Sequence, residues 1–110
     1  MSPVEVVQAQ LDAYNAQDID AFIALFDDDC VIGELNGAIT QCGKAQVRER
    51  YAKLFADYPE NHARLVNRIA AGAVVVDHED IVRAPGGERF QAGAIYSVRD
   101  ARIVRVDFFR

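Results

Sequence analysis

The sequence predicts an α+β fold formed by a single domain that spans residues 1–110. Over residues 1–58 apolar side chains recur every three or four positions, as in amphipathic helices, whereas from His62 onward they alternate with polar ones, as in β-strands. Helices followed by a run of strands are typical of the α+β class. With 110 residues, 51% of them hydrophobic, the chain can form one sizeable core but has no room for a second domain that would bind a cofactor.

Three helices are expected in the first half. Residues 2–5, Ser-Pro-Val-Glu, form a capping box with proline at the first helical position, which predicts a helix over residues 3–15. Asp18 caps a second helix that we expect to run from residue 19 to 26 and to end at Asp27–Asp29, because carboxylates oppose the dipole of a helix C-terminus. A third helix over residues 44–58 ends before Pro59. The first helix buries one apolar stripe, made of Val4, Val7, Leu11 and Tyr14.

Five strands are expected after the second helix. Residues 30–35 form a short strand that ends in a turn around Asn36-Gly37. Four further strands cover residues 64–69, 73–83, 88–99 and 102–110, separated by turn signals at residues 71–72, 85–87 and 100–101. Strands of this length joined by short turns indicate an antiparallel meander that is long enough to curl.

The composition excludes several classes of partner. The formal charge of -5, with 12 basic and 17 acidic residues, argues against a surface that binds nucleic acid or anionic lipid. No apolar run reaches the length of a membrane span, and the N-terminus lacks the pattern of a signal peptide, so a cytoplasmic protein without membrane contact is expected. Cys30 and Cys42 are expected to stay reduced.

A long, curled sheet that follows helices is expected to form a cone around the first helix, with a pocket at its open end. Recognisable motifs stand at Tyr14 with residues 17–20, at residues 24–31, at Gly37, and at residues 43–44 and 47–48. They resemble the nuclear transport factor two-like superfamily, most closely its SnoaL-like and ketosteroid-isomerase-like proteins. Residues 96–106 are similar to the last hairpin of the family, with Ala101 in place of the usual turn glycine. The resemblance implies the cystatin-like α+β barrel, a cone-shaped, mostly antiparallel sheet, but no single reaction, since this superfamily includes isomerases, dehydratases, cyclases and non-catalytic binding proteins.

The resemblance also implies three positions for proton-transfer chemistry. Isomerases of this family use a tyrosine on the first helix as a hydrogen-bond donor to the substrate oxygen, a carboxylate after the start of the first strand as a base, and a protonated aspartate on the penultimate strand as a second donor. The matching positions are Tyr14, Glu34 and Ile95, so the third group is missing. The residues alone leave two alternatives open: Tyr14 can be a packed tyrosine bonded to backbone, and Glu34 can face solvent.

The strand over residues 73–83 carries a second candidate carboxylate. Alternation places Asp77, Glu79 and Arg83 on one face and His78 and Asp80 on the other. The strand order of the resembling family directs the first set toward the pocket. Glu79 is therefore a candidate catalytic residue with Arg83 as its charge partner, and a surface salt bridge is the alternative.

The pocket is expected to bind substrate through side chains from several elements, and the outer face of the sheet to bind a second subunit. Phe109 alternates with charged residues on the outer face, and an exposed aromatic side chain there indicates burial by a partner. Proteins of this resemblance are commonly homodimers packed sheet to sheet, so a homodimer through the sheet is expected. The substrate-binding residues are predicted to be Phe26, Arg83, Ile95, Val106 and Phe108.

No metal or cofactor is expected. His78 and Glu79 are adjacent in a strand, so their side chains point to opposite faces and cannot bind one ion together. The sequence therefore predicts a pocket for a small hydrophobic molecule, in which Tyr14 with Glu34 or Glu79 performs cofactor-independent acid/base chemistry, such as isomerisation or dehydration of a carbonyl compound. The alternative is a non-catalytic ligand-binding or dimeric interaction module of the same fold.

Overall fold

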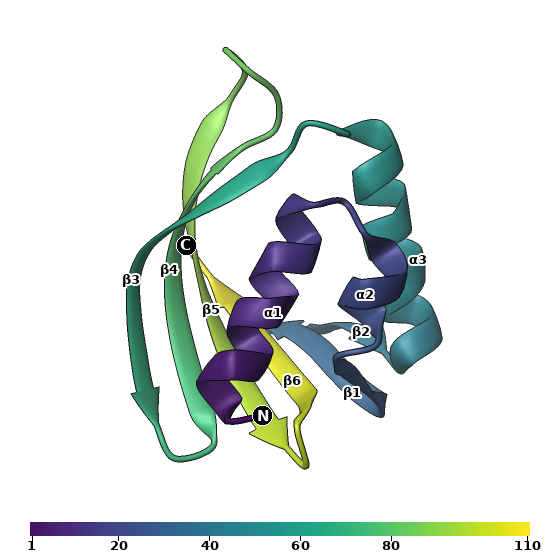
Figure 1. The fold of residues 1–110 in the computed structure, drawn as a ribbon, viewed down its shortest axis with the longest axis vertical. Coiled ribbons are helices and arrows are strands. Elements are labelled where there is room, and N and C mark those ends of the chain that lie inside the picture. Colours follow the sequence, from purple (N-terminus) through teal and green to yellow (C-terminus); the bar gives the residue numbers. More distant parts are fainter.

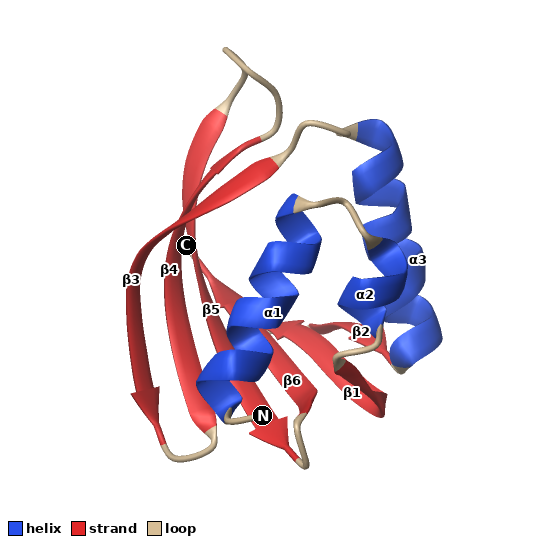
Figure 2. Cartoon of the chain, viewed as in Figure 1, coloured by secondary structure: helices blue, strands red, loops and turns tan.

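The computed structural model describes residues 1–110, with the helices mainly in the first half of the chain and four of the six strands in the second (Figures 1 and 2). This distribution confirms the α+β class. The helices are α1 (Pro3–Asn15), α2 (Ile19–Ile23) and α3 (Lys44–Asp57). The strands are β1 (Phe26–Glu34), β2 (Ile39–Cys42), β3 (His62–Ala71), β4 (Val74–Val82), β5 (Arg89–Arg99) and β6 (Arg102–Phe109).

All six strands belong to one mixed sheet with the order β2-β1-β6-β5-β4-β3. Neighbouring strands are antiparallel except β1 and β6, which are parallel, and β3 to β6 form the predicted meander. The sheet is strongly curved, and α1 lies across its concave face (Figure 1). It is not closed, because β2 and β3 are free edges.

The N-terminus of α1 has the predicted capping box. The backbone N–H of Ser2 donates to the Glu5 carboxylate at 2.8 Å, and the backbone N–H of Glu5 donates to the Ser2 hydroxyl at 3.2 Å. The buried stripe differs at its first position, since Val4 is exposed and Val6 is buried instead. The other end of the stripe is as predicted, because Tyr14 is buried there.

The acidic run Asp27–Asp29 was predicted to end the second helix, but it lies inside β1. Helix α2 already ends at Ile23, and Phe26 pairs with Ile103 of β6. The register between β1 and β6 shifts after Phe26, so the aspartates occupy an irregular stretch that leaves their side chains at the surface. Because Phe26 is buried at the start of β1, the strand can begin there although charged residues follow.

Strand β2 is absent from the sequence prediction. It begins after the expected turn, where Asn36 adopts a positive φ of 57°, and pairs with β1 from Val31 to Gly33. The strand has only four residues, all exposed or half-buried, and therefore no apolar alternation that would predict it. Its role is to form one edge of the sheet, beside the end of β1 that carries Glu34.

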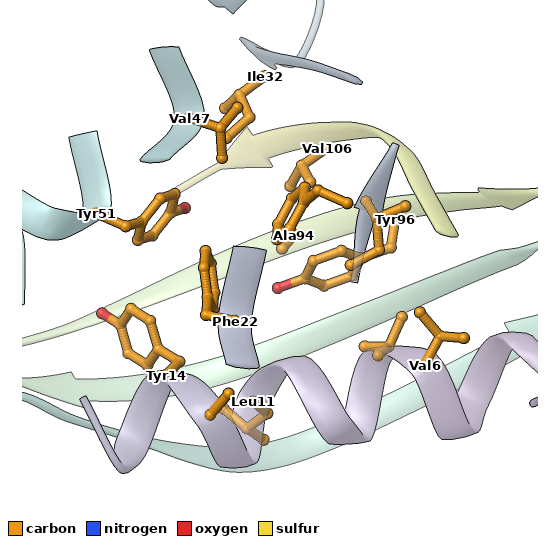
Figure 3. Packing of buried hydrophobic residues seen from close by; sticks show 14 of the residues in the cluster. Val6, Leu11, Tyr14, Phe22, Ile32, Val47, Tyr51, Ala94, Tyr96 and Val106 are labelled. Atoms are coloured by element: carbon orange, nitrogen blue, oxygen red, sulfur yellow. The ribbon is translucent and has the colours of Figure 1, made fainter. Parts of the chain in front are cut away.

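The helices bury an aromatic cluster against the sheet. Phe22 of α2 is fully buried, with its ring centroid 4.5 Å from that of Tyr51 on α3 and 5.0 Å from that of Phe26 on β1. Tyr14 packs edge-on against Tyr51 and Phe55. Figure 3 shows Tyr14, Phe22 and Tyr51 close together, and their ring centroids lie 4.5 to 6.3 Å from one another. The cluster fixes the tyrosine rings, so their hydroxyl groups have defined positions next to the cavity described below.

Candidate functional site

A cavity of about 310 Å³ lies between α3 and the inner faces of β4, β5 and β6. Helix α1 contributes Gln10 and Tyr14 to its wall, and β1 contributes Glu34. Five of the eight sequence-predicted site residues line it, namely Tyr14, Glu34, Glu79, Arg83 and Phe108. The cavity therefore has side chains from both halves of the chain in its wall.

The other three predicted residues do not line the cavity. Phe26 and Val106 are each 1% exposed and belong to the closed core beneath the helices. Ile95 lies on the outer face, because Ala94 and Tyr96 on either side of it are buried on the inner face. The placement of Ile95 in the pocket was wrong by one position in β5, and such a shift moves a side chain to the opposite face of a sheet.

The inner face of β4 is the one predicted from strand order. Val75, Asp77, Glu79 and Ile81 are all buried, whereas the residues between them are only partly so. Arg83 follows directly after the strand and continues the same side of the chain into the cavity. The buried face of β4 thus brings two carboxylates and one guanidinium into the interior.

Glu79 is a buried carboxylate without a partner. Its side chain lines the cavity and the residue is 7% exposed, yet the carboxylate takes part in none of the hydrogen bonds or ion pairs of the chain. Burial and, to a smaller extent, the charge of Asp77 raise its pKa from 4.5 to about 7, while Arg68 acts in the opposite direction. A group with a pKa near 7 can both accept and release a proton at neutral pH.

Asp77, one inner-face position earlier, is neutralised by an arginine. The guanidinium of Arg68 donates to both of its carboxylate oxygens, at 2.7 and 2.9 Å, and Arg68 also donates to Gln8 of α1 at 2.8 Å. A bulge in β3 between Leu65 and Asn67 sets the register that places Arg68 directly opposite Asp77. The Asp77 carboxylate therefore has a structural role as the ion-pair partner of Arg68.

Tyr14 hydrogen-bonds to a side chain, and not to backbone as the structural alternative assumed. The Asn61 amide nitrogen donates to the Tyr14 hydroxyl oxygen at 2.7 Å, and Arg83 donates to the Asn61 amide oxygen at 2.8 Å. Because a guanidinium has only donors, it fixes which end of the Asn61 amide faces Tyr14. The Tyr14 hydroxyl therefore accepts from Asn61, and its own hydrogen is left to donate into the cavity.

Burial keeps Tyr14 protonated. Burial raises the pKa of Tyr14, and the nearby Glu79 charge also raises it, while Asn61 and Arg83 lower it. Burial likewise raises the pKa of Tyr51 and Tyr96, which line the same cavity. The cavity thus presents neutral phenol groups beside the buried carboxylate of Glu79.

Glu34 lies in a different environment from Glu79. It is the last residue of β1, its side chain is exposed, and it contributes to the wall of the cavity from the surface. Its backbone N–H donates to Ala38 across the β1–β2 turn. The structure therefore separates the two candidate carboxylates into one buried and one solvated group.

Sequence reasoning missed Asn61, Gln10, Tyr51 and Tyr96. Asn61 is 2% exposed although it follows Pro59-Glu60 in a connection that looks like a surface loop. Gln10 is 6% exposed and its amide oxygen is buried without a hydrogen bond. A polar residue on the apolar stripe of a helix, one turn before Tyr14, was the signal that could have found Gln10.

The structure contains no group of three or more His, Cys, Asp or Glu side chains close enough to hold a metal ion. None of its helices combines the length and the apolar character that crossing a membrane requires. Cys30 is buried and Cys42 is exposed, and both are free thiols.

A curved sheet that wraps helices, with a cavity beside them, defines an α+β fold of the cystatin-like type. The chain belongs to the SnoaL-like domain family of the nuclear transport factor two-like superfamily, since the family model matches residues 7–106. No curated protein sequence matches it significantly.

Solved structures support this fold assignment. A cystatin-fold protein from Novosphingobium aromaticivorans is 34% identical, with a TM-score of 0.93 over 100% of this chain and 99% of that one. A protein with a ketosteroid-isomerase-like fold from Catenulispora acidiphila, in complex with trimethylamine, is 20% identical, with a TM-score of 0.80 over 100% and 87%. A candidate polyketide cyclase from Sinorhizobium meliloti is 21% identical, with a TM-score of 0.81 over 96% and 94%. The last two similarities show the fold and not the reaction.

Proposed function

We propose that the protein is a cofactor-independent acid/base enzyme of the ketosteroid-isomerase type that acts on a small hydrophobic carbonyl compound. The main support is that Glu79, buried without a partner, lines the same cavity as Tyr14, whose hydroxyl hydrogen is free for a ligand. The two groups are close enough for the charge of Glu79 to raise the pKa of Tyr14. A base and an oxygen-binding donor are the two groups that enolisation needs.

In this reaction the Glu79 carboxylate removes a proton from the carbon beside the substrate carbonyl. The electron pair of the broken C–H bond forms an enolate, and Tyr14 donates a hydrogen bond to its oxygen. Isomerisation is completed when protonated Glu79 returns the proton to a different carbon. Dehydration is completed when the enolate expels a β-hydroxyl group, which takes the proton from Glu79 and leaves as water.

Glu79 is the better base of the two carboxylates because its environment is apolar. Its cross-strand neighbours are Leu65 on β3 and Ala92 on β5, so no donor stabilises its charged form. Glu34 is solvated at the end of β1. A carboxylate in water is a weak base at neutral pH, whereas a buried one with a pKa of about 7 holds a removed proton.

Deuterium exchange tests the proposal without knowledge of the natural substrate. Cyclic enones and β-hydroxy ketones that stabilise the protein in a thermal-shift screen are incubated with it in D₂O, and deuterium uptake beside the carbonyl is followed by NMR. We expect Glu79→Gln to slow exchange by about 10²–10⁴-fold and Tyr14→Phe by about 10²–10³-fold. Glu49→Gln, a matched change at an exposed position of α3, should leave the rate unchanged. Exchange at the wild-type rate in Glu79→Gln would overturn the assignment.

A non-catalytic ligand-binding or interaction module of the same fold is the second candidate. The inner face of β5 carries Ala92, Ala94 and Tyr96 near the cavity, so no carboxyl group occupies that strand as the second donor of the isomerases. This alternative expects ligands that shift the melting temperature, with no exchange catalysed in any of them. The same two measurements therefore decide between the candidates.

We also propose that a second copy of the chain covers the outer face of the sheet. Phe109 is 38% exposed there and lies over Gly93, while Ile69 is 69% exposed on β3. Exposed apolar side chains on a sheet face favour association, because a partner that covers them removes their surface from water. Sedimentation equilibrium is expected to give a dimer that dissociates more readily in Phe109→Lys, and a monomer in the wild-type protein would contradict this proposal.

A further inference from the structure

The arginines of the chain differ in their partners, and Arg99 and Arg102 are exposed at the surface without an ion pair. Outside the cavity, Arg48, Arg64, Arg68, Arg89 and Arg105 each pair with an aspartate. Arg50, Arg83 and Arg110 line the cavity, and none of them forms an ion pair. In a chain with 17 acidic and 12 basic residues, unpaired guanidinium groups gathered at one cavity need a reason.

Arg83 is held in place before any ligand binds. Its guanidinium carbon lies 4.9 Å from the ring centroid of Phe90 and 5.6 Å from that of Tyr58, and one of its N–H groups donates to Asn61. A guanidinium has five N–H donors, so most of them remain free. Because aromatic rings and an amide already fix the side chain, an incoming acceptor has little conformational entropy left to remove.

Arg110 brings a second positive charge to the same ring. Its guanidinium carbon also lies 4.9 Å from the Phe90 centroid, so the two guanidinium carbons can be no further apart than twice that distance. Like charges at such a separation repel each other, with Arg83 half-buried and Arg110 exposed. A bound anion between or beside them would relieve that repulsion and accept the free donors.

The acidic groups of the cavity do not already serve this purpose. Asp57 pairs with Lys53 at 2.7 Å, and Glu34 lies beyond ion-pair distance from every basic group. Glu79 is four residues before Arg83 along the chain, which corresponds to about 13 Å between their α-carbons in an extended strand. The base and the arginines therefore meet the cavity at different places: Glu79 on the inner face of β4, and Arg83 and Arg110 beside Phe90.

We propose that the ligand of this cavity is a carboxylate-bearing carbonyl compound, whose carboxylate binds Arg83 and Arg110 while its apolar body lies on Phe90 and Ile81 toward Tyr14. This inference deepens the proposed function by naming the substrate class of the same site. Arginine suits a carboxylate because its planar fork can donate two parallel hydrogen bonds to it. The Arg83–Asn61–Tyr14 hydrogen bonds connect the anion site with the oxygen-binding donor.

A matched pair of ligands tests the charge preference. Naphthalene-2-carboxylate and its neutral amide, naphthalene-2-carboxamide, have nearly the same shape, and their dissociation constants are measured by calorimetry or ligand-observed NMR at pH 7.5. We expect the wild-type protein to bind the carboxylate about tenfold more tightly or better. Arg83→Gln should abolish this preference, and Arg110→Gln should reduce it. Arg99→Gln removes the same charge from an exposed position without an ion pair and should keep the preference.

The outcomes separate this proposal from the catalytic one. Arg110 makes no hydrogen bond, so its variant tests the anion site even if Arg83→Gln disturbs Asn61 and the fold. Glu79→Gln is expected to keep the carboxylate preference while losing deuterium exchange. A wild-type protein that shows no preference, whether both compounds bind equally or neither binds, overturns the anion site and leaves the role of Glu79 standing. A preference that persists in both Arg83→Gln and Arg110→Gln overturns it as well.

Discussion

Asp77 and Glu79 are neighbours on the inner face of β4, yet their surroundings differ in one respect that decides their roles. The cross-strand neighbours of Asp77 are Arg68 and Ala94, and those of Glu79 are Leu65 and Ala92. Both carboxylates are buried, but only Asp77 has a guanidinium opposite it. A buried carboxylate with an arginine is part of the framework, whereas one without a partner stays available for proton transfer.

The β3 bulge at Val66 produces this difference. Leu65 lies opposite Glu79, and after the extra residue Arg68 lies opposite Asp77. In a regular antiparallel register Asn67 would occupy that place, and the guanidinium would face outward. One inserted residue therefore pairs one carboxylate and leaves the next one unpaired, which is a local way to raise a single pKa inside a small domain.

Loss of the Arg68 guanidinium should have the largest effect on stability. Arg68→Gln leaves Asp77, which is 1% exposed, without a compensating charge, and breaking a buried pair costs about 3–5 kcal/mol of the free energy of unfolding. Urea denaturation at pH 7.5 measures the change. The matched variant Arg64→Gln removes an ion pair with Asp80 from the outer face, where Arg64 is exposed, and should cost less than about 1 kcal/mol. Equal losses in the two variants would remove the distinction between the paired framework charge and a surface pair.

Removal of the unpaired carboxylate should have the opposite effect, and one that depends on pH. The pKa of Glu79 is about 7 in the folded state and near 4.5 when unfolded, so between these values the folded protein holds a proton that the unfolded chain has lost. Its contribution to stability is therefore complete below pH 4.5 and falls as the pH rises toward 7, by about 3 kcal/mol in total. We expect Glu79→Gln to match the wild type at pH 4 and to exceed it by about that amount at pH 8.

The charged and titratable groups that face Glu79 keep this profile simple. The Asp77 carboxylate is paired with the Arg68 guanidinium, and the pKa values of Tyr14, Tyr51 and Tyr96 are raised, so these tyrosines remain neutral over this range. Urea denaturation across the pH range gives the profile, with Glu49→Gln as the control that should run parallel to the wild type. A Glu79→Gln profile that also runs parallel to the wild type would show that the carboxylate is not held neutral by its surroundings.

The periodicity of the sequence predicts that Asp77 and Glu79 share a face of β4, but not that their partners differ. Alternation groups Asp77 with Glu79, and the strand order of the resembling family directs both inward, as their burial confirms. It does not predict the bulge, because one extra residue in β3 leaves an ordinary run of strand-forming residues. It also misplaces Ile95, since a match that is off by one residue is invisible in sequence but reverses the face of the side chain.

Asn61 shows a second limit of sequence reasoning. The connection between α3 and β3 has a composition typical of an exposed turn, and nothing in it indicates a buried amide. Its burial depends on Tyr14 and Arg83, which approach from positions 47 residues before it and 22 residues after it. Such a contact is formed by tertiary structure alone, so only the structure shows that Tyr14 has one hydrogen-bond partner and one free hydrogen.

Removal of the Tyr14 hydroxyl should have a smaller effect on stability than the change at Arg68 on β3 or at Glu79 on β4. In Tyr14→Phe the Asn61 amide nitrogen loses its acceptor in a buried place, which costs about 1–3 kcal/mol. Tyr51→Phe is the matched variant, because the Tyr51 hydroxyl makes no hydrogen bond within the chain, and it should change stability by less than about 0.5 kcal/mol. Thermal unfolding of both variants at pH 7 measures the difference, and a neutral Tyr14→Phe would mean that Asn61 does not depend on the phenol.

The smallest effect is expected at Glu34, the other carboxylate of the cavity. Its side chain is exposed at the end of β1 and has no ion-pair partner, so Glu34→Gln should change the free energy of unfolding by less than about 0.5 kcal/mol at any pH between 4 and 8. The stability profile should therefore keep the full fall with rising pH that Glu79 causes. A flattened profile in Glu34→Gln would mean that the pH dependence of stability does not come from the buried carboxylate, and the comparison between Asp77 and Glu79 would lose its functional meaning.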